Sequence, residues 1–400
     1  MPRLPQARLG LRGMSEVSLD PSGQNAAVCA EARRRMGHEV VPFNPFNLHA
    51  GRYPDLRDVG FNPLLTLNPG SPAFMKELIS LAESSISVEG DSQKHFPESA
   101  RGLMAWVLGF VRMVEGNGAN LGTVRDIVTG NVRGAAQAAV ALGHPRITSL
   151  AYKYTEEISR ELGSVISTAE TQTKWLLDEE MRTSLSTTNA FDFAQLKERR
   201  ISTFLILPAG TELELHGVWL KMVVTCALNA LYRSGDAGKV PVLFLLSEFA
   251  QLGKVAPIRA AFGQARKYGL RMFPVLQNWG QLIDIYGQNG ALTFLGNSGC
   301  LIGFNPGNDS ESAEMLSKLS DEHGVVMANA SPDPQAPGGV RGGFGEGRER
   351  VWSPGRIRQL PEYHALVFKH RQSQPQPVYC PPWWNIAACR RVGRRDPYHP

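Results

Sequence analysis

The sequence predicts an α/β fold in which a mostly parallel sheet is divided by an all-helical insertion. Short apolar runs typical of buried strands occur at residues 38–43, 201–207, 240–246, 270–276, 300–304 and 364–370. Most of these runs are hydrophobic throughout rather than alternating, as expected for strands covered on both faces of a parallel sheet. Helical patterns lie between several of the runs, which favours a layered α/β domain.

The helical patterns divide the chain into parts. Residues 212–234 and 256–269 have helical spacing on either side of the 240–246 run, and Asn308 offers an N-cap for a later helix. Residues 95–190 keep helical spacing without any strand run, which predicts an all-α domain. We therefore expect four parts, namely residues 1–94 and 191–385 of one α/β domain, the insertion 95–190 and a basic tail 386–400.

The remaining composition sets limits without pointing to a single function. The chain has 400 residues with 42% hydrophobic content and a net charge of +5, which allows a nucleic acid or another anionic partner. Its five cysteines form no C-x-x-C pair, which fits a reducing cytoplasm, and no run approaches the roughly 18 apolar residues of a spanning helix. Residues 330–350 are rich in glycine and proline and are expected to form a mobile surface loop.

Polar residues follow two of the predicted strands where ligands of parallel sheets usually bind. Ser247 and Glu248 end the 240–246 run, Gln277 ends the next one, and Arg266 lies on the helix between them. A carboxylate, an amide and a guanidinium could together orient water and neutralise charge on a phosphate. The same residues also fit an acid at a helix start, a loop glutamine and a solvated arginine, so spacing alone leaves both interpretations open.

Three ordered segments decide between these interpretations by resemblance. The runs "FLLSEFAQLGK", "ARKYGLRMFPVLQNWGQLIDIYG" and "FLGNSGCLIGFNPGNDSESAEMLSKL" resemble the second half of TraG/TraD-type coupling proteins of type IV secretion and conjugation systems. Upstream, "SLDPSGQNAAV" resembles that family's strand-Asp-Pro-x-Gly-helix segment. The resemblance covers about residues 15–385. It implies a RecA-like P-loop NTPase core, ATP and Mg²⁺ as cofactors, and a hexameric ATPase that pumps DNA.

The resemblance also assigns roles to individual residues. Glu248 would be the catalytic Walker B glutamate, Arg266 the arginine finger and Gln277 the sensor glutamine. Two departures count against ATP and Mg²⁺ binding by this chain. Ser247 replaces the Mg²⁺-binding aspartate, and the sequence contains no G-x-x-x-x-G-K-[ST] loop. We therefore expect a truncated or split form of the family, catalytically impaired and lacking the family's transmembrane helices.

DNA is the partner that the resemblance implies, together with other secretion components and further copies in a hexamer. The four tail arginines Arg390, Arg391, Arg394 and Arg395 are the candidate DNA-binding residues, and a cluster at residues 33–35 is a second basic site. Family members work at the cytoplasmic face of the inner membrane, whereas this chain alone is expected to be cytoplasmic. The alternative function is a non-catalytic DNA-binding, protein-binding or assembly remnant of such a protein.

Overall fold

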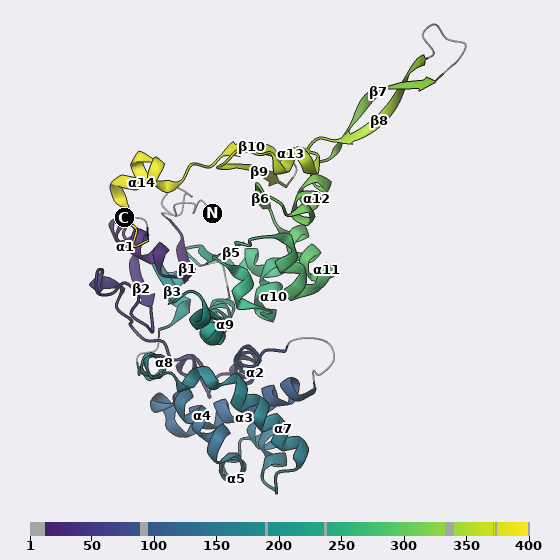
Figure 1. Ribbon diagram of the computed structural model, residues 1–400. Coiled ribbons are helices and arrows are strands. Elements are labelled where there is room, and N and C mark those ends of the chain that lie inside the picture. Colours follow the sequence, from purple (N-terminus) through teal and green to yellow (C-terminus); the bar gives the residue numbers. More distant parts are fainter. Residues whose placement is uncertain are drawn as a thin grey trace. The chain divides into compact units, whose positions relative to one another are not determined.

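The computed structural model describes residues 13–88, 95–188, 191–235, 238–332, 340–370, 372 and 374–398 (Figure 1). The chain forms two compact units. Among the described residues, the larger unit comprises those from 13 to 275 and from 388 to 398, and the smaller unit comprises those from 276 to 387. A parallel sheet organises the larger unit, and an antiparallel sheet organises the smaller one.

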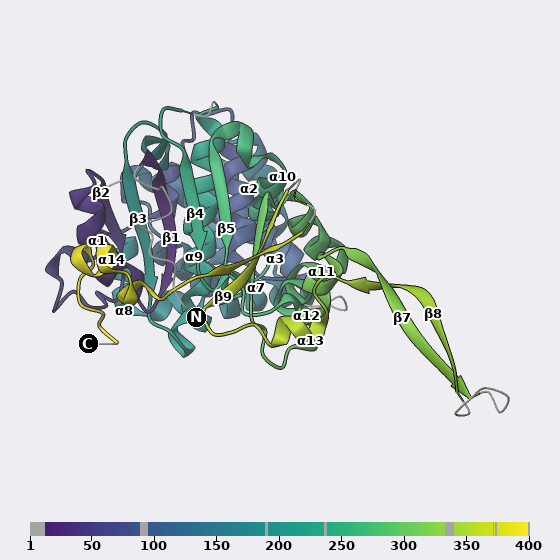
Figure 2. The same ribbon diagram turned by 90° about the horizontal axis from the view of Figure 1, so that it is seen from above.

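The parallel sheet has five strands in the order β2-β3-β1-β4-β5 (Figure 2). Every neighbouring pair is parallel. The predicted α/β class is therefore confirmed, and the apolar runs at 38–43, 201–207, 240–246 and 270–276 are strands. Their bounds are β1 Ser15–Pro21, β2 Glu39–Phe43, β3 Ile201–Leu207, β4 Val242–Leu246 and β5 Leu270–Pro274.

Helices cover both faces of this sheet. Helix α1 (Gln24–Arg35) connects β1 to β2 in one direction, whereas α9 (Thr211–Arg233) connects β3 to β4 in the other. Right-handed crossovers in opposite directions place the two helices on opposite faces. Helix α10 (Ala256–Gln264) continues in the same direction as α9 and packs against it. The strand order reverses around β1, so the carboxyl ends of β3, β1 and β4 form the usual ligand-binding edge.

The central strand β1 carries charge inside the core. All seven of its residues are buried, including Glu16 and Asp20. Glu16 forms an ion pair with Arg33 of α1, and both side chains are 1% exposed. Because a buried charge is costly without a partner, this pair fixes α1 on the sheet in one position. The polar residues of β1 also explain why a search for apolar runs misses this strand.

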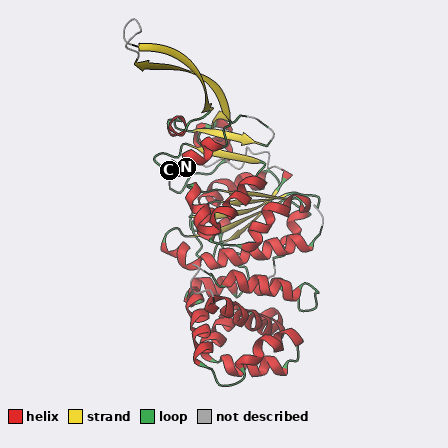
Figure 3. Ribbon diagram, turned by 90° about the vertical axis from the view of Figure 1, so that its right-hand side faces the viewer, coloured by secondary structure: helices red, strands yellow, loops and turns green. Residues whose placement is uncertain are grey.

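The all-α region follows β2 and consists of helices alone (Figure 3). Helix α3 is its centre and packs against α2, α4, α6 and α7. At Gly109 of α3, an added Cβ would lie 2.6 Å from Ile147 and 2.8 Å from Leu78, so three helices meet closely there. The bounds are α2 Phe74–Ser85, α3 His95–Glu115, α4 Leu121–Gly130, α5 Val132–Ala141, α6 Pro145–Ala151, α7 Arg160–Gln172 and α8 Glu179–Leu185.

Helix α9 lies between the sheet and the all-α region, packing against β3 and against α2. Burial from both sides accounts for its apolar residues, including the fully buried Trp219. Within the described residues, Leu213–Arg233 of α9 is the one helix long and apolar enough to cross a membrane, but 72% of its most apolar window is buried inside the protein. A core helix accounts for these properties without a bilayer.

The smaller unit has its own three-stranded sheet in the order β10-β9-β6, and both pairings are antiparallel. The apolar runs 300–304 and 364–370 therefore form strands, but they do not join the parallel sheet. Leu316, Ile357, Leu360 and Leu366 form a separate core beneath it. The bounds are β6 Cys300–Phe304, β9 His364–Lys369, β10 Gln376–Tyr379, α11 Trp279–Asn297, α12 Ser310–Lys318 and α13 Pro354–Arg358.

Two local predictions for this unit are wrong. The segment 330–350 is not a loop throughout, because β7 (Glu322–Pro332) and β8 (Val340–Arg350) pair as an antiparallel hairpin, while residues 333–339 lie outside the described part (Figure 1). The glycines of β8 suggested a turn, yet strand pairing overrides their local preference. Helix α12 is capped by Asp309, whose carboxylate accepts the backbone N–H of Ser312, and not by Asn308.

Candidate functional site at the carboxyl edge of the sheet

Glu248 lies at the carboxyl end of β4 in a conformation that is unusual for its residue type. Its φ of 53° and ψ of 48° are left-handed, and it immediately precedes the short helical turn Phe249–Leu252. Phe249 behind it is fully buried, and its N–H donates to the carbonyl of Val275 at 3.0 Å. The buried neighbour thus holds Glu248 in a backbone conformation that costs a non-glycine residue about 1 kcal/mol.

Asp20 faces the same edge from the neighbouring strand. Leu19 pairs with Leu246, so one residue further Asp20 is level with Ser247. The Asp20 carboxylate accepts the backbone N–H groups of Asn25 at 3.0 Å and Ala26 at 2.7 Å. It therefore caps α1 and occupies the amides that would otherwise attract an anion. The Asp-Pro-x-Gly pattern before a helix was the sequence signal for this residue, although not for its capping role.

Arg266 lies at the opposite edge of the sheet from Glu248. It belongs to the short turn Ala265–Tyr268, which directly precedes β5, and its side chain is exposed. Because β4 and β5 are parallel and Val242 pairs with Leu270, the start of β5 is level with the start of β4. Glu248 lies six residues beyond Val242, which is about 20 Å for an extended chain. The fold does not bring Arg266 and Glu248 of one chain together.

Gln277 lies just beyond β5, in the smaller unit. The chain divides between Val275 and Leu276, and the side chain of Gln277 is exposed. Its backbone N–H donates to the side-chain oxygen of Gln281 at 3.0 Å, while Asn278 caps α11. These contacts order the backbone around Gln277 and leave its side-chain amide pointing to solvent.

The basic tail contains one clamped arginine and three exposed ones. The Arg394 guanidinium donates to Asp55 at 2.8 Å and to Glu31 at 3.2 Å, and it lies 5.2 Å from the Tyr53 ring centre. Partial burial opposes charge on Asp55, but hydrogen bonds from Arg394 and Arg34 outweigh it and lower the pKa of Asp55. By contrast, Arg390, Arg391 and Arg395 have exposed side chains.

The tail also covers the turn that follows β1. Gln24 donates to the buried Asp396 carboxylate at 2.5 Å, and the Tyr398 hydroxyl donates to the carbonyl of Ser22 at 3.0 Å. The Tyr398 ring stands edge-on to His49, which itself contacts the same Ser22 carbonyl. The last described residues of the chain therefore pack beside the carboxyl end of the central strand.

The other early arginines, at residues 33–35, are engaged in the fold. Arg33 is buried against Glu16, Arg34 pairs with Asp55, and Arg35 pairs with Glu31. This cluster therefore supports the packing of α1.

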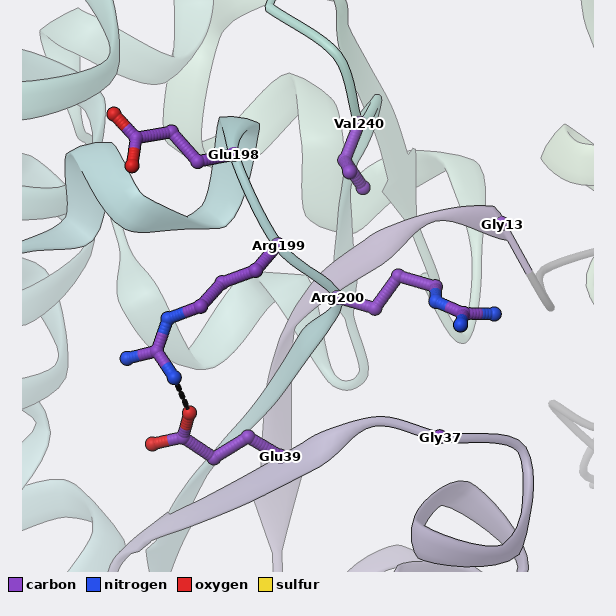
Figure 4. A pocket seen from close by; sticks show the side chains of 7 residues that line it. All are labelled: Gly13, Gly37, Glu39, Glu198, Arg199, Arg200 and Val240. Carbon is purple, nitrogen blue, oxygen red and sulfur yellow. Dashed lines mark hydrogen bonds and ion pairs between the residues drawn. The ribbon is translucent and has the colours of Figure 1, made fainter.

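A pocket of about 390 Å³ opens at the amino edge of the sheet (Figure 4). It is lined by residues just before β1, β3 and β4 and around the start of β2, including Glu39, Glu198, Arg199 and Arg200. Arg199 is paired with Glu39, and the Arg200 guanidinium extends past Gly37. With two acidic and two basic side chains, this pocket has no dominant charge. It lies at the amino edge of the sheet, opposite the carboxyl edge where ligands of parallel sheets usually bind.

Comparison with known proteins decides the family. The family described as Type IV secretory system Conjugative DNA transfer matches residues 11–370. The chain belongs to this family. It is 26% identical over 326 residues to the type IV secretion system-coupling protein VirD4 of Bartonella henselae, covering 79% of this chain and 50% of that protein. It is 24% identical over 325 residues to the conjugal transfer protein TraG of Rhizobium radiobacter, covering 76% and 47%.

Solved structures confirm the fold. The bacterial conjugative coupling protein TrwBdeltaN70 matches 93% of this chain and 79% of its own, with a TM-score of 0.67 and 18% identity. TrwB in complex with ADP and Mg²⁺ matches with a TM-score of 0.65 and 19% identity. The predicted TraG/TraD-type family and RecA-like core are confirmed. The chain spans about half the length of the curated relatives it matches.

Proposed function

We propose that this chain acts in conjugative DNA transfer as a subunit of a type IV secretion coupling complex, and that its carboxyl sheet edge takes part in ATP-driven DNA translocation. The observation that carries the proposal is the strained Glu248 at the end of β4, beside the point where the strand order reverses. Strain of this kind gathers at functional sites. A carboxylate there is suited to polarise a water molecule.

The chain's own residues do not fit a complete nucleotide site. Asp20 already occupies the first amides of α1, and Ser247 supplies no charge for a metal ion. Across the described ranges, no group of three or more His, Cys, Asp or Glu side chains could hold a metal ion. We therefore expect ATP and Mg²⁺ to be bound in an assembly with a chain that supplies a phosphate-binding loop, while this chain supplies individual side chains.

Arg266 is the side chain best placed for such a contribution. It is exposed, and it lies at the amino edge of β5, away from Glu248 of the same chain. An arginine that cannot reach its own carboxyl edge can still neutralise phosphoryl charge in a neighbouring subunit. Ring assembly with a family member, up to a hexamer, is therefore part of the proposal, as is membrane attachment through such a partner.

The test is magnesium-dependent ATP turnover in a mixed assembly. We expect the 400-residue chain to show no turnover alone and to increase the turnover of a full-length VirD4-type protein when the two are mixed. Arg266→Ala should remove the increase, whereas Lys267→Ala, which removes the neighbouring exposed charge, should keep it. Equal increases from wild type and Arg266→Ala would contradict the trans role. Turnover of about 1 s⁻¹ by the chain alone, lost in Glu248→Gln, would show a complete site.

The exposed tail arginines favour a second, non-catalytic role in binding DNA. Arg390, Arg391 and Arg395 carry charge that can contact phosphates without reading bases. Replacing all three with alanine should weaken binding to any duplex and reduce the slope of affinity against salt by up to about 3. A large preference for one duplex over an unrelated one at fixed salt would contradict this role.

A further inference from the structure

The β7–β8 hairpin is a ribbon that leaves both of its edges unpaired. Within the described residues, these two strands form a sheet of their own, with no third strand. A two-stranded ribbon is marginally stable in water unless something else supports it. The base of the hairpin has such support, because Arg350 donates to Glu314 of α12 at 2.7 Å. Further out, the described contacts of the ribbon are between its own two strands.

The outer part of the ribbon exposes apolar side chains. Phe344 is 86% exposed and Val326 is 73% exposed, more than any other large hydrophobic side chain among the described residues. Val326 pairs across the ribbon with Glu346, and Phe344 lies two residues before Glu346 on β8, so these three residues lie on one face. An unpaired edge beside exposed apolar residues is a template for adding another strand.

The charges on β8 indicate which strand would be added. Glu346 and Arg348 lie on the same face two residues apart, and across the ribbon they oppose Val326 and Gly324, which carry no charge. Neither side chain forms an ion pair within the part of the chain that the structure describes. Glu346-Gly347-Arg348 is therefore complementary to its own antiparallel copy, because reversing the strand places each acid opposite a base.

We propose that β8 pairs edge to edge with β8 of a second copy of this chain, antiparallel and centred on Gly347. In this register each Glu346 faces Arg348 of the other copy, twice by symmetry. A register centred on Glu346 would set two glutamates against each other, and one centred on Arg348 would set two arginines against each other. Pairing extends the two-stranded ribbon to a four-stranded antiparallel sheet, which is stable where the isolated ribbon is marginal.

The β7 edge has no charge pattern that would favour one register of pairing with its own copy. Its ionisable residues, Glu322 and His323, lie at its beginning, and the following residues through Val326 have no ionisable side chain. No register of β7 with its own copy is distinguished by ion pairs there. The β8 edge also places Phe344 level with Arg350 of the other copy, whose aliphatic stem can cover an aromatic ring.

A charge exchange tests the pairing. Sedimentation equilibrium should show that Glu346→Arg and Arg348→Glu each raise the dimer dissociation constant roughly 10- to 100-fold, since two attractive pairs become repulsive. The double variant Glu346→Arg/Arg348→Glu restores opposite charges and should return to within about threefold of wild type. Glu349 lies on the other face of the ribbon, where the proposed register places it opposite Gly345 of the second copy. Glu349→Arg therefore makes the same charge change away from the proposed ion pairs and should leave the dimer dissociation constant nearly unchanged.

A crosslink tests the register independently. In a chain with Cys300→Ser and Cys380→Ser, Gly347→Cys places two thiols directly opposite each other, and oxidised glutathione should convert the chain into a disulfide-linked dimer. Gly345→Cys should form no disulfide-linked dimer, because its two copies would be about 13 Å apart along the strands. Dissociation constants that are equal in all charge variants, a double variant as weak as the single ones, or equal crosslinking at both cysteines would each overturn the proposal.

Discussion

The neighbouring strands β1 and β4 both end in polar residues, yet the two ends are built differently. Asp20 of β1 is fully buried, and its carboxylate accepts two backbone N–H groups of α1. Glu248 after β4 is only half-buried and has a left-handed backbone, and its carboxylate makes no hydrogen bond or ion pair within the described ranges. The first arrangement is what stability requires, whereas the second costs stability and points to a role outside the fold.

The same contrast holds among the arginines. Arg33 and Arg394 are fixed by carboxylates, one inside the core and one at the tail, while Arg266 and Arg390 are exposed. Removing a fixed charge should therefore lower the stability of the fold, whereas removing an exposed charge should weaken binding to a partner. This separation is testable with single substitutions.

The largest effect is expected from Arg33→Ala. The substitution leaves the Glu16 carboxylate buried without its ion-pair partner, which should lower the free energy of unfolding by about 3–5 kcal/mol. Chemical denaturation measures the loss. Arg35→Ala is the matched control, since its pair with Glu31 is exposed and its removal should cost about 0.5 kcal/mol or less. Similar costs for the two variants would remove the distinction between the fixed and exposed charges.

The pH dependence of stability provides a second test of Arg33→Ala. Burial raises the pKa of Glu16 above its ordinary value of 4.5. A carboxyl whose pKa is raised by folding destabilises the folded state once the pH exceeds the pKa of the unfolded chain. Losing the Arg33 charge raises this pKa further, so the deficit of Arg33→Ala should be smallest at low pH, where Glu16 is protonated in both proteins, and should grow as the pH rises through the folded-state pKa of the wild-type carboxyl.

The second effect is expected from the cap at the end of β1. Asp20→Ala removes the acceptor for two α1 amides and should cost about 1–2 kcal/mol. Asp20→Asn keeps an oxygen acceptor and should cost less. Ser247→Ala, one strand away at the same level, should change the free energy of unfolding by no more than about 0.5 kcal/mol. A larger cost for Ser247→Ala than for Asp20→Ala would reverse the comparison between the two strand ends.

The sequence was sufficient for most of the parallel sheet because four of its strands are mainly apolar runs. Hydrophobicity alone missed β1, whose Ser15, Glu16, Ser18 and Asp20 are polar but buried, and only the resemblance of the Asp-Pro-x-Gly segment indicated a strand there. Those residues are compatible with the core because they pair with residues elsewhere in the chain, as Glu16 does with Arg33. The runs at 300–304 and 364–370 were found as strands, but hydrophobicity does not encode that they pair with each other in a separate antiparallel sheet.

Sequence spacing identified the residues of the candidate site, but it did not predict how far apart in space they lie. Ser247 and Glu248 end β4 as expected, since a strand boundary is a local property. Arg266 lies at the amino edge because β5, which follows it, runs parallel to β4. Sequence motifs alone do not give the direction of a strand in the sheet. The clamp on Arg394 depends on Asp55, 339 residues earlier in the chain, so composition alone marks it only as one of four basic residues.

A smaller effect is expected from Arg394→Ala. Losing the contacts with Asp55 and Glu31 should cost about 1 kcal/mol and free the tail, because these pairs are only partly buried. Trypsin should then cleave faster at Arg390 and Arg391. In the wild type, the lowered pKa of Asp55 means that the tail contact is present above about pH 3.8 and lost as the pH falls further. Unchanged cleavage in the variant would show that Arg394 does not hold the tail.

The smallest effect, and the one that most sharpens the comparison of the strand ends, is expected from Glu248→Gly. Glycine adopts a φ of 53° without the steric cost that a side chain imposes, but it also makes the unfolded chain more flexible. Glu248→Ala removes the carboxylate and keeps the Cβ, so it is the matched control. We expect the glycine variant to be more stable than the alanine variant by up to about 1 kcal/mol. If the two variants unfold at the same denaturant concentration, the left-handed backbone at Glu248 stores no strain, and the β4 end differs from the β1 end only in its exposure.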